Sequence, residues 1–354
     1  MGERSVISID GMGGDHAPAC VVAGLERFAK ARTDFHFLLH GDEPTLKPML
    51  AQCVSASART IIRHAEKTIA MDAKPAQAVK QGKGSSMWNA IETVKSGEAI
   101  AALSAGNTGA LMGMSKLILR TVEGIHRPAL IASWPTQNGV SAVLDLGADI
   151  DADAEQLVDF AIMGAAFARA VHHKPNPSVA LLNIGSEDQK GRETVREAAR
   201  LIRSSTLNLN FHGFVEGDDL SKGTADVVVT DGYTGNIALK TAEGAARMIS
   251  TLLKDALTSG AMSRAGALLA RPALRRFQAR LDPRYVNGAV FVGLNGIVVK
   301  SHGGTDDVGF AQAISVAADM GASRFKAEID ENLRRLMADA KATPPVGASE
   351  ETAR

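Results

Sequence analysis

A short apolar strand, then a Gly-, Asn- or Asp-rich turn, then a helix occurs four times along this 354-residue chain, with the turns at 9–15, 104–109, 183–188 and 230–236. A turn that opens a helix leaves free backbone N–H groups at the positive end of the helix dipole, and both favour an anion. Parallel α/β sheets place such turns on one edge. We therefore expect the four turns to converge on one negatively charged ligand, most simply phosphate.

The rest of the chain repeats this alternation. Most apolar runs are rich in Val, Ile and Leu on both faces, which is typical of a parallel sheet covered on both sides. We expect strands at 6–9, 35–40, 60–63, 99–104, 140–144, 179–184, 208–214, 227–230 and 297–300. Helical patterns lie at 18–31, 85–96, 110–121, 153–171, 191–204, 236–257 and 307–336. The alternation predicts a doubly wound α/β sheet.

Composition narrows the class of protein. Lys+Arg and Asp+Glu both total 39, and this balance argues against general nucleic-acid binding, which needs a basic surplus. The only cysteines, Cys20 and Cys53, support neither a disulfide framework nor a cysteine-rich zinc site, so we expect a reducing cytoplasm. We find no signal peptide and no apolar run of the ~20 residues that a membrane span needs.

The segment 259–284 interrupts the alternation. It contains no strand pattern. It has six arginines but a single acidic residue, Asp282, and Leu and Phe residues lie between the arginines. Gly260, Gly266 and Pro272 indicate broken helices that project from the sheet. We expect one catalytic α/β domain over 1–340 carrying this Arg-rich protrusion, followed by a disordered tail at 341–354.

The turn residues are the candidate ligand-binding groups. Glycine lets a backbone approach a ligand closely, and Asn and Thr offer uncharged hydrogen-bonding groups; the alternative is a plain strand–helix turn in which glycine supplies positive φ. We expect phosphate or acyl contacts from Gly11, Gly13, Gly14, Gly106, Thr108, Gly109, Gly185, Gly232, Thr234, Gly235, Lys300 and Ser301. We expect catalytic roles for Asn107, Lys190, Asp231, Asn236 and His302.

Each of these roles has a structural alternative. Lys190 is a point-charge phosphate ligand or a solvated lysine, and Asp231 lines the ligand or makes a local Asx-turn. His302, after a strand, is an acid–base group or a hydrogen-bonded structural residue. The sequence contains no G-x-S-x-G elbow, Walker A motif or H-E-x-x-H motif, so it offers no obvious covalent acyl carrier, and we expect no metal.

Taken together, the motifs resemble one family. They are the turns above with Arg127-Pro128-Ala129-Leu130, Leu144-Asp145-Leu146-Gly147-Ala148, Lys190-Gly191, Gly213-Phe214-Val215-Glu216-Gly217 and Lys300-Ser301-His302-Gly303. In this order they resemble the phosphate acyltransferases of bacterial phospholipid synthesis, known as PlsX, from about Ile7 to about Ser323. Asp149, Tyr233 and Thr305 depart from the usual Asn, Phe and Ala or Ser.

The resemblance implies that inorganic phosphate attacks the thioester of a long-chain acyl carrier protein (acyl-ACP), giving acyl phosphate without a cofactor. It implies a three-layer α/β/α fold like that of phosphotransacetylases and isopropylmalate dehydrogenases, and a homodimer. It also implies peripheral membrane association, because a membrane-bound glycerol-phosphate acyltransferase takes the product. The alternatives are a phosphotransacetylase that acts on short acyl-CoA and a non-catalytic protein that binds a phosphate metabolite.

A mechanism follows as a hypothesis. The backbone amides of 106–109 and 232–236, with Lys190 or Lys300, hold the phosphate; an N–H pair or Asn107 stabilises the thioester oxyanion; and His302 is an optional acid. The Arg-rich segment is a solvated face, a docking site for acidic ACP or, slightly favoured, a contact with an anionic membrane. Its contact residues would be Arg271, Leu274, Arg275, Arg276, Phe277 and Arg280.

Overall fold

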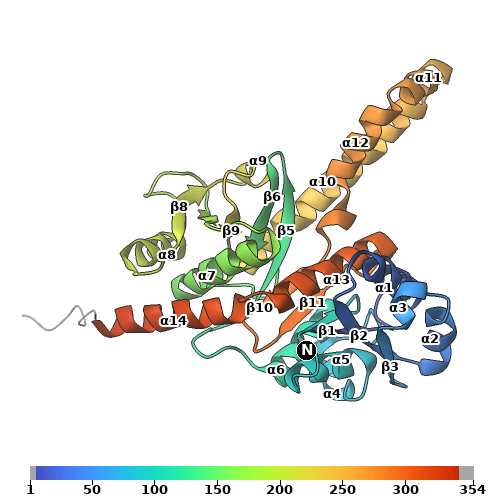
Figure 1. Ribbon diagram of the computed structural model, residues 1–354. Coiled ribbons are helices and arrows are strands. Elements are labelled where there is room, and N and C mark those ends of the chain that lie inside the picture. Colours follow the sequence, from blue (N-terminus) through green and yellow to red (C-terminus); the bar gives the residue numbers. More distant parts are fainter. Residues whose placement is uncertain (1–4, 343–354) are drawn as a thin grey trace, which may run out of the picture.

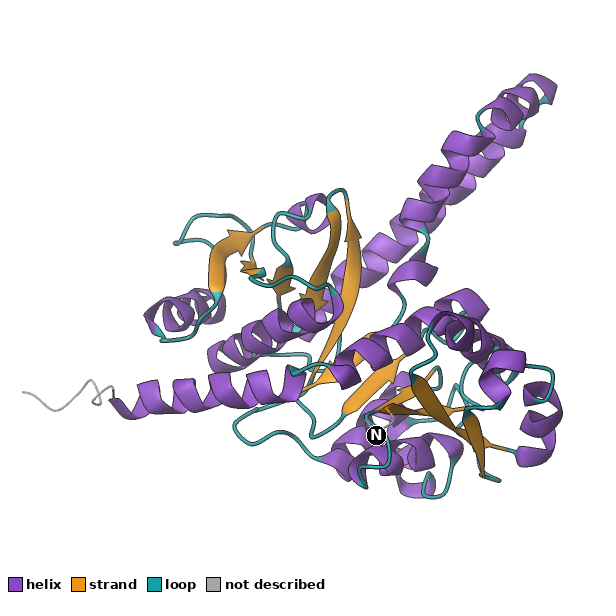
Figure 2. Cartoon of the chain, viewed as in Figure 1, coloured by secondary structure: helices purple, strands orange, loops and turns teal. Residues whose placement is uncertain are grey.

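A computed structural model describes residues 5–342, and most of the predicted tail lies outside them. Its core is one eleven-stranded sheet in the order β3-β2-β1-β4-β11-β10-β5-β6-β9-β7-β8 (Figures 1 and 2). The strands are β1 (Ser5–Asp10), β2 (Phe35–Gly41), β3 (Thr60–His64), β4 (Ala101–Ser104), β5 (Ala129–Thr136), β6 (Gly139–Leu144), β7 (Ser178–Leu182), β8 (Asn210–Val215), β9 (Val227–Val229), β10 (Ala289–Val292) and β11 (Ile297–Lys300).

Helices cover both faces of the sheet. They are α1 (Ala19–Ala31), α2 (Glu43–Leu50), α3 (Val54–Ser57), α4 (Pro75–Gln81), α5 (Ser86–Lys95), α6 (Thr108–Leu119), α7 (Ala154–Val171), α8 (Glu193–Ser204), α9 (Asp219–Lys222), α10 (Gly232–Thr258), α11 (Ala261–Leu269), α12 (Arg271–Leu281), α13 (Asp307–Ala322) and α14 (Phe325–Ala342), with a 3₁₀ turn η1 (Pro283–Val286). Leu103 belongs to a buried cluster that includes residues of α1, α7 and α13, whereas its neighbour Ala102 belongs to a second cluster that includes residues of α4, α5 and α6. Successive residues of a strand point to opposite faces, so the three-layer α/β/α fold is confirmed.

The two halves of the sheet point in opposite directions. β1, β4 and β11 are parallel to one another, and β6, β9 and β7 are likewise parallel. Three antiparallel pairings join the halves: β11 with β10, β10 with β5, and β5 with β6. An odd number of reversals makes the turns after β1 and β4 leave one edge and the turns after β7 and β9 leave the other. The premise that all four turns leave the same edge is therefore wrong.

The two strands that cause the reversal, β5 and β10, were not expected from the sequence. β5 contains Ser133 and Pro135, which interrupt its apolar pattern, and β10 is only four residues long. Pro135 lacks the N–H that a ladder uses, so proline in a run argues against a central strand. Their assignment depends on neighbours that are far away in the sequence: β5 pairs with β10 about 160 residues later, for example Leu130 with Phe291.

A projecting helical segment extends away from the sheet, as expected for 259–284 (Figure 1). It consists of α10, α11 and α12, and the only buried residues of α10 are Gly232 and Gly235 at its start. Apolar side chains such as Met262 (89% exposed) and Leu269 (85% exposed) face solvent here. The side chain of Arg280 lies outside the described side chains. Within residues 5–342, the helices all fall short of the length or apolar content needed to cross a bilayer.

Candidate functional site

Three turns meet at the edge where β1, β4 and β11 end. Asp15 N donates to Gly303 O at 2.9 Å, and Ser301 N donates to Ser104 O at 2.9 Å. A Cβ on Gly13 would lie 2.8 Å from the backbone nitrogen of Gly106, so only glycine allows this approach. We call residues 10–16, 104–109 and 300–304 the three-turn cluster. It unites two of the four predicted turns with the predicted Lys300–His302 segment.

A buried hydrogen-bond chain fixes the first two turns. Ser104 Oγ donates to Asp10 Oδ2 at 2.7 Å and accepts from Gly106 N at 3.0 Å, while Met12 N donates to Asp10 Oδ1 at 3.2 Å. Burial raises the pKa of Asp10, although the hydrogen bonds from Ser86, Ser104 and the backbone oppose that rise. Asp10 therefore holds the turns together from inside the protein.

Lys300 joins the second turn to the third. Its side chain is buried, and Nζ donates to Ala105 O at 3.1 Å and also to Ser301 O. Burial lowers the pKa of Lys300 to about 8, while the charges of Asp15 and Asp10 oppose that fall. At pH 7 the cluster thus contains an ammonium group in a poorly solvated place, where its attraction for an anion is weakly screened.

The amino end of α6 lies in the same cluster. Asn107 is its N-cap, because Oδ1 accepts from Ala110 N at 2.9 Å, and Nδ2 donates to Met71 O at 2.7 Å and Ala73 O at 3.1 Å. Both amide hydrogens of Asn107 are thus engaged, so the expectation that they stabilise an oxyanion has no support in this geometry. The backbone N–H groups of Thr108 and Gly109 make no hydrogen bond within residues 5–342 and remain available to an anion.

The third turn presents Ser301 and His302 differently. Ser301 is buried, and its Oγ accepts from Asn287 Nδ2 at 2.8 Å. His302 is exposed; its backbone N donates to Asn287 Oδ1 at 3.0 Å, and its Nδ1 accepts from Gly304 N at 3.2 Å. Asn287, which the sequence reasoning missed, therefore anchors both residues. It lies in an irregular stretch before β10 and carries no motif that would have revealed it.

The opposite edge holds Asp231, Gly232, Thr234, Gly235 and Asn236. Gly232 N donates to Asp149 O and Gly235 N to Asp231 O, both at 2.9 Å. The buried Asp145 accepts from the backbone N–H groups of Leu130, Gly147, Ala148 and Asp149, and burial raises its pKa. Asp231 caps α10 through Thr234 N at 2.7 Å and pairs with Arg192 at 2.7 Å. A Cβ on Gly232 or Gly235 would collide with the backbone at Asp149 or Asp145. These residues build a tightly packed turn, and it leaves the sheet at the edge opposite the three-turn cluster.

Lys190 and Gly185 belong to a separate surface turn after β7. Lys190 is exposed and forms an ion pair with Glu187 at 2.9 Å, which raises its pKa. Gly185 packs against the stem of the Lys190 side chain. The solvated-lysine alternative fits these contacts better than a phosphate-ligand role.

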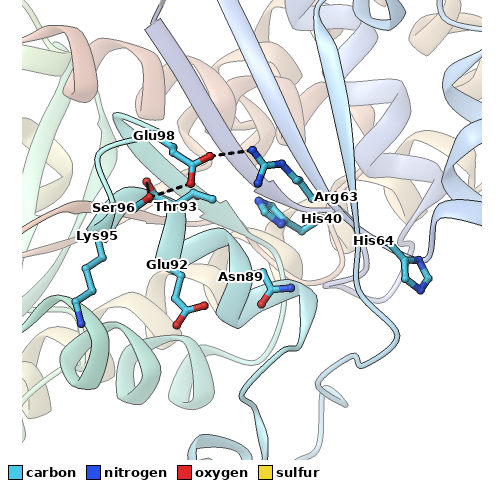
Figure 3. Close-up of a pocket in the computed structure, with 9 residues that line it drawn as sticks. All are labelled: His40, Arg63, His64, Asn89, Glu92, Thr93, Lys95, Ser96 and Glu98. Carbon is cyan, nitrogen blue, oxygen red and sulfur yellow. Dashed lines mark hydrogen bonds and ion pairs between the residues drawn. The ribbon is translucent and has the colours of Figure 1, made fainter.

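A cavity of about 670 Å³ opens between α5 and the strands β2 and β3 (Figure 3). The carboxylates of Glu92 and Glu98 line it, and Glu98 is paired with Arg63 at 2.8 Å. His40 lines it too, and burial lowers its pKa to about 4, so this imidazole is neutral at pH 7. The cavity contains none of the predicted site residues. Its two carboxylates balance the charges of Arg63 and Lys95, so it has little net attraction for an anion. Nor do the side chains of the described part of the chain gather into a metal-binding group.

Comparison with known proteins agrees with this architecture. A sequence model of the family described as "fatty acid synthesis protein" matches residues 5–328. The phosphate acyltransferase of Caulobacter vibrioides is 57% identical over 342 residues, covering 97% of this chain and 95% of that protein. That of Phenylobacterium zucineum is 53% identical over 352 residues, covering 99% and 100%.

Solved structures resemble the fold. A phosphotransacetylase from Streptococcus pyogenes superposes with a TM-score of 0.61 at 17% identity, covering 91% of this chain and 95% of that one. The EutD phosphotransacetylase from Staphylococcus aureus gives a TM-score of 0.59 at 16% identity, covering 90% and 95%. With the family match over most of its length and relatives more than half identical, this chain belongs to the fatty acid synthesis protein family of phosphate acyltransferases.

Proposed function

We propose that this acyltransferase moves a long-chain acyl group from acyl-ACP to inorganic phosphate, giving an acyl phosphate for phospholipid synthesis. Family membership supports transfer of an acyl group to phosphate. One structural observation supports a location for the phosphate. Two unbonded backbone N–H groups at the start of α6 lie in the same cluster as the buried Lys300 ammonium. An oxyanion fits this combination of dipole and charge.

The reaction needs positioning more than deprotonation, because phosphate is already an oxygen nucleophile. Thr108 N and Gly109 N hold it, and the Lys300 ammonium stabilises its charge. A phosphate oxygen attacks the thioester carbon; the tetrahedral intermediate then expels the thiolate, with the electron pair of the C–S bond leaving on sulfur. Correct placement of two reactants can supply ~7–11 kcal/mol of the barrier. This mechanism requires no Ser or Cys acyl carrier.

The remaining predicted residues take supporting roles in this proposal. Asn107 positions the start of α6, and Gly13 and Gly106 allow the first two turns to approach each other. His302 is the exposed group that can protonate the leaving thiolate. Asp231 and Asn236 shape the opposite edge of the sheet, where Asn236 Nδ2 donates to Leu146 O at 3.3 Å.

The projecting segment supports a partner proposal. Its exposed apolar residues, together with Arg271, Arg275, Arg276 and Phe277, suit the surface of an anionic membrane. We include peripheral membrane association of a cytoplasmic homodimer in the proposal, with a membrane-bound glycerol-phosphate acyltransferase as the consumer of the product. Docking of ACP on the same segment is the competing assignment.

Acyl phosphate formation tests the proposed function directly. The purified protein is incubated with phosphate and either palmitoyl-ACP or acetyl-CoA, and the product is trapped as a hydroxamate with hydroxylamine. Product from palmitoyl-ACP and none from acetyl-CoA supports the proposal. Product from acetyl-CoA alone would make the protein a phosphotransacetylase, and phosphate binding without turnover of either donor would make it a binding protein.

A further inference from the structure

A second cavity of about 670 Å³ lies beside the three-turn cluster, between the segment 67–74 and α4. We call it the α4 groove; its lining includes Lys67, Ile69, Asp72, Lys74, Gln77 and Gln81. Its volume lies within the roughly 300–1,000 Å³ typical of small-molecule sites. The function proposed above leaves it without a ligand.

The wall of the α4 groove is tied to the candidate catalytic cluster at several points. Asn107 Nδ2 donates to the carbonyls of Met71 and Ala73. A Cβ on Gly303 would lie 2.6 Å from Cε of the Met71 side chain. At the start of the segment, Ser86 N donates to Lys67 O at 3.0 Å. A Cβ on Gly109 would lie 2.5 Å from Pro75, the first residue of α4. The wall of the groove is therefore in direct contact with the start of α6.

The lining specifies the chemistry of that ligand. Gln77 and Gln81 lie one turn apart on α4 and offer carboxamides, which pair with amide groups. Lys67 and Lys74 form no salt bridge within the described part of the chain, so two ammonium groups are free for a phosphate against one carboxylate, Asp72. Ile69 and Ala73 contribute apolar surface. An acyl chain would leave these polar groups unpaired, and inorganic phosphate alone would fill little of the volume.

We propose that the α4 groove binds the phosphopantetheine arm of the acyl donor, an inference that rests on the function proposed above. The arm has two amide bonds and a hydroxyl group, one end is a phosphate ester, and the other end is the thioester. Its amides face Gln77 and Gln81, its phosphate faces Lys67 and Lys74, and its thioester reaches Thr108 and Gly109. ACP and coenzyme A both carry this arm, so the groove recognises what the two donors share.

The test compares three donors with the same long acyl chain: the ACP thioester, the CoA thioester and the N-acetylcysteamine thioester, which lacks the phosphate end. The double variant Lys67→Ala/Lys74→Ala should raise the KM for the ACP and CoA donors about tenfold, which corresponds to about 1.4 kcal/mol. It should leave the KM for phosphate and the kcat/KM for the truncated donor unchanged. The matched control is Lys80→Ala/Lys83→Ala, which removes two neighbouring lysines that do not line the groove.

Three outcomes would overturn the assignment: an unchanged KM for all donors, an equal loss with the truncated donor, or a loss with ACP alone, which would place the lysines against the carrier protein instead. Calorimetric titration with free 4′-phosphopantetheine gives a readout without turnover. Wild type should bind it and the double variant should bind at least tenfold more weakly. Binding with no acyl phosphate from any donor would refute the proposed function alone; turnover without this binding would refute the groove alone.

Discussion

Replacing Lys300 by methionine tests the electrostatics of the three-turn cluster. The side chain keeps its approximate length but loses an ammonium whose pKa burial has lowered from 10.5 to about 8. Because the folded chain releases this proton at lower pH than the unfolded chain, the unfolded chain binds more protons between pH 8 and pH 10.5. The stability of the wild type therefore rises with pH in this window, and Lys300→Met removes that rise.

The magnitude follows from the same pKa values. The interval between about 8 and 10.5 corresponds to about 3 kcal/mol of unfolding free energy, at roughly 1.4 kcal/mol for each pH unit. Urea unfolding of both proteins at several pH values between 7 and 10.5 measures the difference between them. The difference in unfolding free energy should move in favour of the wild type as pH rises. The contributions of other titrating groups cancel, because both proteins contain them.

Activity should change in the opposite direction. The wild-type kcat/KM should fall as pH rises through about 8, since the neutral amine no longer attracts phosphate, and Lys300→Met should be nearly inactive at pH 7. Lys190→Met is the matched control, because Lys190 is exposed and paired with Glu187. A stability difference that stays flat from pH 8 to pH 10.5 would refute the reasoning, because Lys300 would then be well solvated.

Three further perturbations follow from the geometry. Asn107→Ala removes the cap of α6 and both donors to the segment 67–74. Urea unfolding should show a loss of about 1 kcal/mol in unfolding free energy, and turnover should fall roughly 100-fold. Equal turnover in the variant would contradict a positioning role. Gly13→Ala places a Cβ 2.5 Å from Asp10 Oδ2, so thermal unfolding should show a loss of about 1–3 kcal/mol, whereas Gly244→Ala, in open space on α10, should be neutral or stabilising. Arg275→Glu/Arg276→Glu should abolish co-sedimentation with anionic vesicles while acyl phosphate formation in solution persists; undiminished sedimentation would remove the segment from membrane binding.

The sequence located part of the candidate site because that part depends on local rules. Residues 104–109 follow a strand and open α6, and an Asn before a helix is a common N-cap, as Asn107 proved to be. The turn at 230–236 has the same local pattern, and Asp231 caps its helix as Asn107 does. There, however, Asp149 O accepts from Gly232 N, and Asp145 accepts from the neighbouring amides of 147–149. Sequence reasoning could not separate these turns, because the distinction depends on which acceptors from elsewhere in the fold reach the amides.

The sequence by itself determined that this chain is a covered α/β sheet, because the apolar pattern of each strand and helix is written in neighbouring residues. Only the tertiary structure decided which turns share an edge. Strand direction depends on pairing between distant segments, and the reversal through β10 and β5 sends the Lys190 and Asp231 turns to the opposite edge from Lys300 and Gly106. Desolvation decided the rest: Lys300 and His302 are two residues apart, yet burial changes the pKa of Lys300 while His302 stays exposed.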